Sequence, residues 1–159
     1  MAYFNSYCGS KRGLAVLIRN DTPITDIEWE NVIPGNFSKL SFKANKDIFL
    51  INAYTHLIKT VTQMTIKTKV MDDTGEEEYN HRIITGDYNV ALNHNLDTSG
   101  YLHVNNPNTR EYLLRQANLS NLIDIWRIRN PNSREYTFHK KQARNFTRAR
   151  LNFFLVSEN

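Results

Sequence analysis

The chain has 159 residues, of which 40% are hydrophobic and 23% charged, and its formal net charge is +4. This composition excludes a disordered chain, because it holds enough apolar residues for a core. The single cysteine, Cys8, excludes an internal disulfide framework, and no apolar run is long enough to cross a bilayer. With no signal peptide evident, we expect one domain over residues 1–159 in an intracellular protein, in the nucleus or the cytoplasm.

Apolar runs predict three buried strands before residue 90. Gly13 to Ile18 is a continuous apolar run, and Asp47 to Tyr54 contains three consecutive apolar residues, as in a strand covered on both faces. Arg82 to Thr85 predicts a shorter strand that ends at Gly86. Residues 57–81 fit both a helical stripe and strand alternation, so both structures stay open there.

One helix and two further strands are expected in the rest of the chain. Asn108 and Glu111 form a capping-box pattern that predicts a helix from Asn108 to about Leu119. Glu135 to His139 and Arg150 to Val156 predict two strands joined by a basic hairpin. Strands outnumber helices and come in mixed order, so the predicted class is α+β, an α/β sandwich with sheet packed on sheet.

Positive charge is concentrated at the C-terminal end. From Ile125 onward eight basic side chains stand against two acidic ones, which makes this segment formally +6 and the remainder −2. Aromatic residues lie between the basic ones, at Trp126, Tyr136, Phe138 and Phe146. Such a segment suits a phosphate backbone, but a solvated surface that happens to be basic has the same composition.

The segment Gly86-Asp87-Tyr88-Asn89 follows an apolar strand and carries the chemistry. Residues two apart on an extended backbone point to the same side, so Asp87 and Asn89 are expected to project together and Tyr88 the other way. A carboxylate beside a carboxamide can polarise a water and donate a hydrogen bond to a phosphate oxygen. The same four residues are also typical of a turn in which Asp and Asn bond their own backbone.

Five segments, taken in chain order, resemble signatures of the endonuclease/exonuclease/phosphatase superfamily, to which DNase I and the apurinic/apyrimidinic endonucleases belong. They are Gly13-Leu14-Ala15-Val16-Leu17-Ile18, Ile51-Asn52-Ala53-Tyr54, Gly86-Asp87-Tyr88-Asn89, Tyr136-Thr137-Phe138 and Ala149-Arg150-Leu151-Asn152-Phe153-Phe154-Leu155. Two more, Leu96-Asp97-Thr98-Ser99-Gly100-Tyr101 and Leu122-Ile123-Asp124-Ile125-Trp126-Arg127, are similar to endonucleases of LINE-type (non-LTR) retrotransposons. The resemblance covers most of the chain and implies a DNase I-like fold, with two packed mixed sheets flanked by helices.

The resemblance implies a magnesium-dependent endonuclease that nicks target DNA for retrotransposition. Asp87 would orient or deprotonate the attacking water and be a weak magnesium ligand, Asn89 would hold the scissile phosphate, and Tyr54 would hydrogen-bond a phosphate oxygen. The ion would neutralise charge on the phosphate oxygens. Intact relatives are fused to a reverse transcriptase, and we expect a monomer.

The resemblance also implies where DNA lies. Thr137, at the base of the basic hairpin, would lie near the DNA backbone, although an ordinary β-branched strand residue is the alternative interpretation. The hairpin itself would supply the cationic contacts, from Lys140, Lys141, Arg144 and Arg148.

The departures from the family suggest a domain truncated at both ends. The main metal-binding Glu would precede Met1, and the Ser-Asp-His would follow Asn159, so we expect the chain to be inactive on its own. The Asp that orients this His is Asn152 here, which accepts a hydrogen bond but cannot stabilise an imidazolium by charge. The alternatives are a non-catalytic nucleic-acid-binding remnant and a phosphoesterase of the same superfamily that acts on small substrates.

Overall fold

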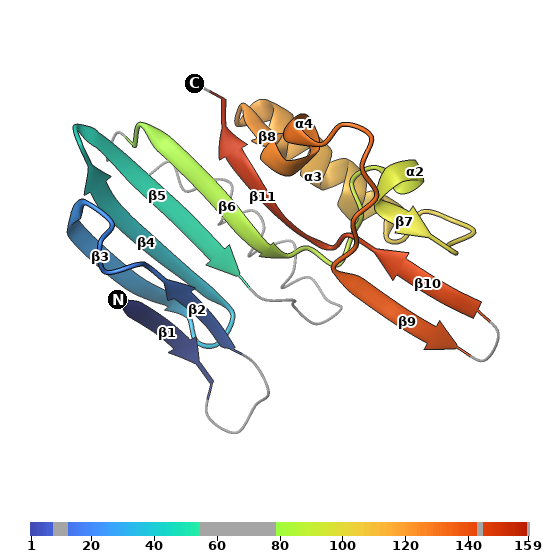
Figure 1. Cartoon of the computed structure of the whole chain (residues 1–159), viewed down its shortest axis with the longest axis horizontal. Helices are drawn as coiled ribbons and strands as arrows, with labels where there is room; N and C mark the ends of the chain where they lie inside the picture. Colours follow the sequence, from blue (N-terminus) through green and yellow to red (C-terminus); the bar gives the residue numbers. More distant parts are fainter. Residues whose placement is uncertain (8–12, 55–78, 143–144, 159) are drawn as a thin grey trace. The chain divides into compact units, whose positions relative to one another are not determined.

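The computed structural model describes residues 1–7, 13–54, 79–142 and 145–158 (Figure 1). They form two compact units, Met1–Gly86 and Asp87–Glu158. Cys8, Arg144 and most of the ambiguous stretch at 57–81 lie outside the described residues. The single domain expected over residues 1–159 stays a prediction. No described helix is long and apolar enough to span a membrane.

The first unit consists of strands alone among its described residues. A hairpin pairs β1 (Ala2–Ser6) with β2 (Gly13–Leu17). A second sheet runs antiparallel through β3 (Ile24–Ile33), β4 (Phe37–Ala44) and β5 (Asp47–Tyr54), and β6 (His81–Asp87) then pairs parallel with β5. The predicted strands are therefore confirmed, with ends shifted by a residue or two in β2 and β6. Strands β1, β3 and β4 were not predicted.

Asn5 joins the two sheets of this unit from a buried position. It is 2% exposed, and its amide donates to the carbonyls of Ile33 and Phe37 and to the hydroxyl of Ser38. Its Oδ1 accepts the backbone N–H of Gly35. All the polar groups of this side chain are satisfied, so Asn5 can lie beside the apolar core without a desolvation penalty.

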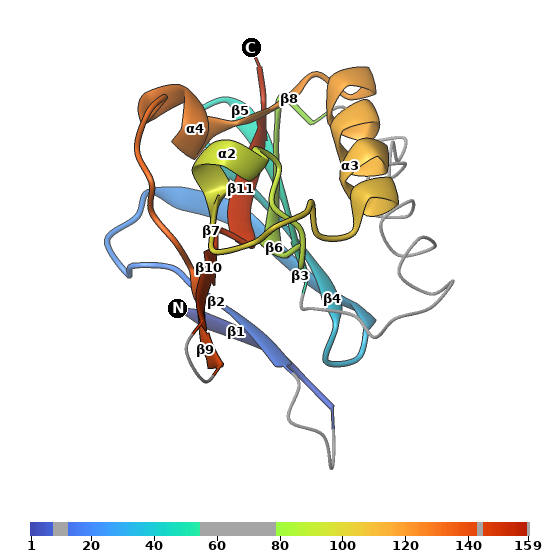
Figure 2. The ribbon, with the colours of Figure 1, turned by 90° about the vertical axis from the view of Figure 1, so that its right-hand side faces the viewer.

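The second unit holds the helices, a three-stranded sheet and one antiparallel pair of strands. In chain order its elements are α2 (His94–Asp97), β7 (Thr98–Ser99), α3 (Pro107–Leu119), β8 (Leu122–Asp124), α4 (Ile125–Arg129), β9 (Phe138–Gln142), β10 (Asn145–Ala149) and β11 (Asn152–Ser157). β10 pairs with β9 on one edge and with β7 on the other, while β11 pairs with β8. Figure 2 shows α3 and α4 on opposite sides of the β8 and β11 strands. The core lies around Leu113, Leu151, Phe153 and Leu155.

Helix α3 is confirmed, but its predicted cap is wrong. The N-cap is Asn106, which has a left-handed φ of 50° and makes no side-chain cap hydrogen bond, and Pro107 begins the helix. Asn108 lies inside the first turn, and no acidic residue stands there, so Glu111 completes no capping box. Proline is favoured at the first helical position because its missing N–H would be unpaired there anyway.

The last two predicted strands begin later than expected, and they do not pair with each other as the two arms of the basic hairpin. β9 instead pairs with β10, a strand that was not predicted, and β11 pairs with β8. β9 begins at Phe138 instead of Glu135, and β11 at Asn152 instead of Arg150. The backbone N–H of Arg150 donates to the carbonyl of Asp97, which turns the chain away from β11 pairing at this point. Sequence alternation therefore fails at Arg150, which is buried, whereas Asn152 and Phe154 on β11 are exposed.

Candidate functional site

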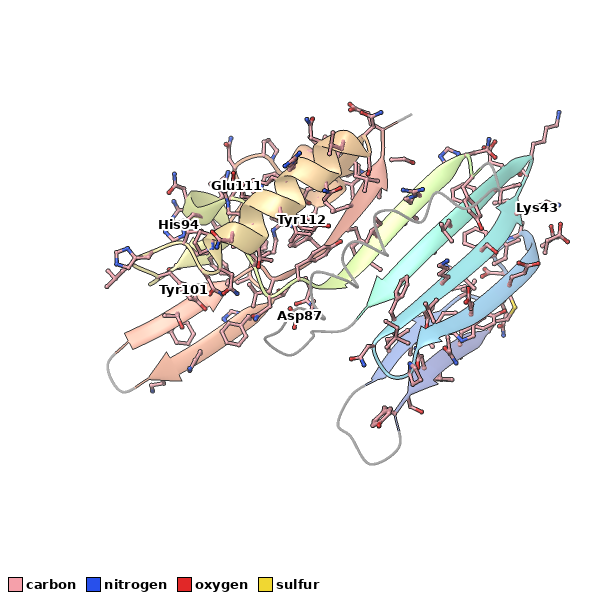
Figure 3. All side chains as sticks on the ribbon, turned by 180° about the vertical axis from the view of Figure 1, so that it is seen from behind. Lys43, Asp87, His94, Tyr101, Glu111 and Tyr112 are labelled. Carbon is pink, nitrogen blue, oxygen red and sulfur yellow. The ribbon has the colours of Figure 1, made fainter. Side chains whose placement is uncertain are left out.

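The Asp87–Asn89 segment forms a tight turn directly after β6 (Figure 3). The Asp87 Oδ1 accepts the backbone N–H of Asn89 at 2.9 Å, and Asn89 has a left-handed φ of 49°. This is the turn that the sequence allowed as an alternative to a simple strand end, because Asn tolerates positive φ. The Asp87 side chain is half-buried, and among the described residues its second carboxylate oxygen accepts no hydrogen bond.

Tyr88 anchors this turn to the core of the second unit. The ring is 2% exposed and stacks on Phe153, with centroids 3.8 Å apart and planes at 5°. The Tyr88 backbone N–H donates to the Leu151 carbonyl at 2.9 Å. The Tyr88 ring lies in the core, while Asp87 and Asn89 are half-buried. The positive φ of Asn89 departs from the extended backbone on which the predicted common direction of Asp87 and Asn89 rested, so that direction stays a prediction.

The other side of the turn is held by two asparagines that precede α3. The side-chain amides of Asn105 and Asn106 donate to the Asn89 carbonyl at 3.4 and 3.2 Å. Asn106 therefore uses its amide on this turn, and its side chain makes no cap hydrogen bond to its own helix. The backbone of the motif is held from the β11 side and from the α3 side.

Thr137 and Asn152 lie together at the base of the hairpin. The Thr137 hydroxyl oxygen accepts the backbone N–H groups of Leu151 and Asn152 at 2.9 and 3.2 Å. It can still donate its own proton outward, because the side chain is exposed. Thr137 precedes β9, so it is not an ordinary strand residue, and the Asn152 side chain is exposed on β11.

Tyr54 belongs to the first unit and ends β5. The parallel register places its backbone opposite Gly86, the residue before Asp87. The Tyr54 side chain lies outside the described residues, so its expected contact with a phosphate oxygen stays a prediction.

The hairpin residues predicted to bind DNA are exposed where they are described. Lys140 and Lys141 lie on β9, and Arg148 lies on β10. The Arg148 guanidinium stands 4.5 Å from the centroid of the Phe146 ring, a cation–π contact. Arg144 lies outside the described residues.

A buried ion network in the second unit was not predicted. Arg150, 3% exposed, donates through Nε to Asp97 Oδ1 at 2.8 Å and through Nη1 to Asp124 Oδ1 at 3.2 Å. Arg127 also donates to Asp97, and through Nη1 to the carbonyls of Asn130 and Ser133. The network therefore anchors the loop that leads to Thr137. Both aspartates lie in segments that resemble retrotransposon endonucleases, but a pair 53 residues apart has no local sequence pattern.

The charge state of the network follows from its contacts. Burial alone would raise the pKa of Asp97, but hydrogen bonds and charge from Arg150, with help from Arg127 and the Asn93 N–H, outweigh it and lower that pKa. Burial opposes the charge on Arg150 as well, and Asp97 and Asp124 together raise the pKa of Arg150. Asp97 and Arg150 are therefore both ionised at neutral pH and paired with each other.

The chain resembles known proteins in structure but matches none in sequence. Neither a protein-family model nor a curated protein sequence matches the chain. Among solved structures, the endonuclease domain of TRAS1, a telomere-specific non-LTR retrotransposon, matches 99% of this chain and 67% of its own, with TM-score 0.64 and 12% identity. The chain has the DNase I-like fold.

Two further structures agree with this fold. The AP endonuclease LMAP from Leishmania major matches 79% of the DNase I-like chain with TM-score 0.56 and 15% identity, and TDP2 from Caenorhabditis elegans matches 100% with TM-score 0.54 and 12% identity. The chain spans 67% of the retrotransposon domain and 46% and 47% of the other two proteins. The predicted α+β class with mixed sheets is confirmed.

No group of three or more His, Cys, Asp or Glu side chains lies together among the described residues of this DNase I-like chain. Asp97 and Asp124 are paired with arginines, and one oxygen of Asp87 already accepts the Asn89 N–H. A magnesium ion prefers several oxygen ligands in octahedral geometry. The metal-ligand role expected of Asp87 therefore stays a prediction.

Proposed function

We propose that the chain is part of a DNA endonuclease, a phosphodiesterase that nicks target DNA in retrotransposition, and that it does not nick DNA on its own. The observation that carries the proposal is the anchored Asp87–Asn89 turn at the end of β6, in a chain with the DNase I-like fold. The TRAS1 domain and LMAP support a nuclease, since both of these similar structures are endonucleases.

The proposed reaction is hydrolysis of one phosphodiester bond. A water molecule loses a proton toward Asp87 and its oxygen bonds the phosphorus, while the bond from phosphorus to the 3′ oxygen breaks. The 3′ oxygen takes up a proton, which leaves a 3′-hydroxyl and a 5′-phosphate. Asn89 would hold the phosphate through its carboxamide, and Thr137 could donate its free proton to a neighbouring phosphate. Magnesium dependence is expected from the family resemblance, and no step is assigned to the ion.

A chimera tests the catalytic part of the proposal. The chain replaces the matching two thirds of the TRAS1 endonuclease domain, and conversion of supercoiled plasmid to the nicked form is measured with magnesium and with EDTA. We expect magnesium-dependent nicking that Asp87→Ala lowers ~100-fold or more, the usual cost of removing one transition-state group. Asp21→Asn is the matched control, since Asp21 is 67% exposed and pairs with Arg19 on the surface.

The 159-residue chain alone should bind DNA without measurable nicking. Robust nicking that Asp87→Ala abolishes would contradict its expected inactivity. A chimera that folds and binds DNA but does not nick would favour the second candidate, a non-catalytic nucleic-acid-binding remnant. The observation that favours this remnant is the exposed Asn152 beside a basic hairpin. Hydrolysis of a small phosphomonoester instead of plasmid would favour a phosphoesterase.

A further inference from the structure

The antiparallel register divides the side chains of the β9–β10 hairpin (Figure 1) between two faces. The antiparallel register pairs His139 with Arg148 and Lys141 with Phe146. Directly opposed residues share a face of the sheet, and so do residues two apart along a strand. These four side chains therefore form one face, here called the aromatic-cationic face, whereas Phe138 and Lys140 lie on the other.

Tyr136, which precedes β9, and the planar groups of the aromatic-cationic face form a continuous row. The Tyr136 ring meets His139 edge-on at 6.4 Å, and His139 lies 6.1 Å from Phe146. The Arg148 guanidinium then covers Phe146 at 4.5 Å from the ring centroid. His139 and Arg148 are exposed, and Phe146 is 44% exposed, so the row faces solvent.

The base of the hairpin is held in place by β7. Arg148 pairs with Ser99 across the β10–β7 edge. Gly100 follows β7 in the sequence and has a φ of +75°. Its backbone lies so close to β10 that an added Cβ would stand 2.4 Å from the Phe146 carbonyl oxygen. The backbone under the Phe146 ring is therefore fixed before any ligand arrives, which lowers the entropic cost of binding.

Binding to intact duplex DNA does not require a row of exposed planar side chains. Its bases are stacked on one another, and a backbone contact requires only positive charge. Aromatic rings and guanidinium planes instead stack on bases that have left the helix, and each stacked base contributes about 1–3 kcal/mol. An exposed phenylalanine between Lys141 and Arg148 combines both elements, a stacking surface with phosphate contacts at its sides.

We propose that the aromatic-cationic face binds unstacked bases of single-stranded or locally melted DNA, with Phe146 as the stacking residue. Lys141 and Arg148 contact the phosphates of the same strand. The proposal rests on the proposed function only in that its ligand is DNA, and it names the form of DNA that the hairpin prefers.

Binding of the full 159-residue chain to three labelled DNAs tests this proposal. They are a single strand, its duplex, and the duplex with a central mismatch bubble, each measured by fluorescence anisotropy at one salt concentration. Phe146→Ala should weaken binding to the single strand and the bubble by roughly 5- to 150-fold, the equivalent of one stacked base, and change duplex binding by less than about twofold. Phe146→Tyr keeps the ring and should bind like the native chain, which separates stacking from misfolding.

Two lysines provide a matched charge control. Lys140→Gln and Lys141→Gln remove the same charge from neighbouring positions on opposite faces of the hairpin. Only Lys141→Gln should lower the preference for the single strand over the duplex. Equal weakening by Phe146→Ala on all three DNAs, or no weakening at all, would overturn the proposal. A chimera that does not nick but keeps this preference would contradict the proposed function alone.

Discussion

Asp97 shows how a buried charge is stabilised in the second unit. Its side chain is fully buried, yet two guanidinium groups and the Asn93 N–H hydrogen-bond the carboxylate. The pKa of Asp97 in the folded chain is lowered from its usual 3.8. As the pH falls, the unfolded chain is therefore protonated at a higher pH than the folded chain. The resulting stability is complete above the unfolded pKa and is lost as the pH falls through the folded one.

Asp97→Asn should destabilise the protein strongly. The substitution leaves the two guanidinium groups of Arg150 and Arg127 with Asp124 as their remaining counter-ion, and one uncompensated buried charge commonly costs about 3–5 kcal/mol. Urea unfolding at a series of pH values measures it, and the native chain should lose more stability than the variant below the ordinary pKa of 3.8. Asp21→Asn, at an exposed pair, should change neither quantity appreciably. Equal stability of native chain and Asp97→Asn at neutral pH would show that the network is not coupled to folding.

Asn152 is expected to affect catalysis and not stability. Its side chain is exposed on β11, so Asn152→Asp should hardly change the unfolding free energy. In the chimera an imidazole from the grafted segment would be oriented by residue 152, and a carboxylate would also stabilise its protonated form. We expect Asn152→Asp to raise the nicking rate at least about tenfold, or ~1.4 kcal/mol of barrier, with DNA affinity unchanged. Equal rates for Asn and Asp between about pH 6 and 9 would contradict this role of residue 152.

Among the elements, β3 was not predicted, and its irregular pairing with β4 gives the physical reason. β3 contains two register shifts against β4, and Asp26 within it has a φ of 49°. Each bulge shifts the alternation by one residue, so Ile24, Ile27 and Trp29 are spaced three and then two apart and show no strand period. β5, which has no bulge against β4, was predicted with correct ends.

At the candidate site, too, a local sequence pattern could be predicted but contacts between distant residues could not. The Asp87–Asn89 motif could be predicted because its four residues are consecutive and follow an apolar strand. The support for the motif could not be predicted, since it comes from Leu151, Phe153 and the asparagines before α3, each distant in sequence. Local sequence patterns predict which residues carry chemistry, whereas tertiary contacts decide how they are held.

Gly100 tests how β7 supports the hairpin. Gly100→Ala places a Cβ 2.4 Å from the Phe146 carbonyl oxygen, at φ +75°. The left-handed backbone alone costs about 1–2 kcal/mol for a residue with a Cβ, and the clash adds to it. Thermal unfolding should show a decrease in stability of at least this size. Gly13→Ala is the milder comparison, because its Cβ would come no nearer than 3.2 Å to the Asn5 carbonyl oxygen. A similar effect at both positions would contradict a specific role for the β7 contact.

For the whole molecule, the uneven charge predicts how DNA affinity depends on salt. The logarithm of DNA affinity falls linearly with the logarithm of salt concentration. Replacing Lys140, Lys141 and Arg148 together by Gln should make this dependence less steep, by about 0.9 for each duplex phosphate that the hairpin no longer neutralises. The slope is measured by titration from low to moderate salt. Lys46→Gln removes an exposed charge from the first unit and should leave the slope unchanged. An unchanged slope in the triple variant would mean that the basic hairpin is only a solvated surface.

The separation of Asp97 and Arg150 along the chain also affects folding kinetics. The two residues lie 53 positions apart, so a long loop must close before their ion pair can form. Before this loop closes, the Asp97 carboxylate has no Arg150 partner and stays hydrated. During synthesis, Arg150 is added after α2, α3 and α4. Its ion pair with Asp97 in the interior of the second unit can therefore form only after these helices have been synthesised. We therefore expect this late, long-range closure to slow the folding of the second unit.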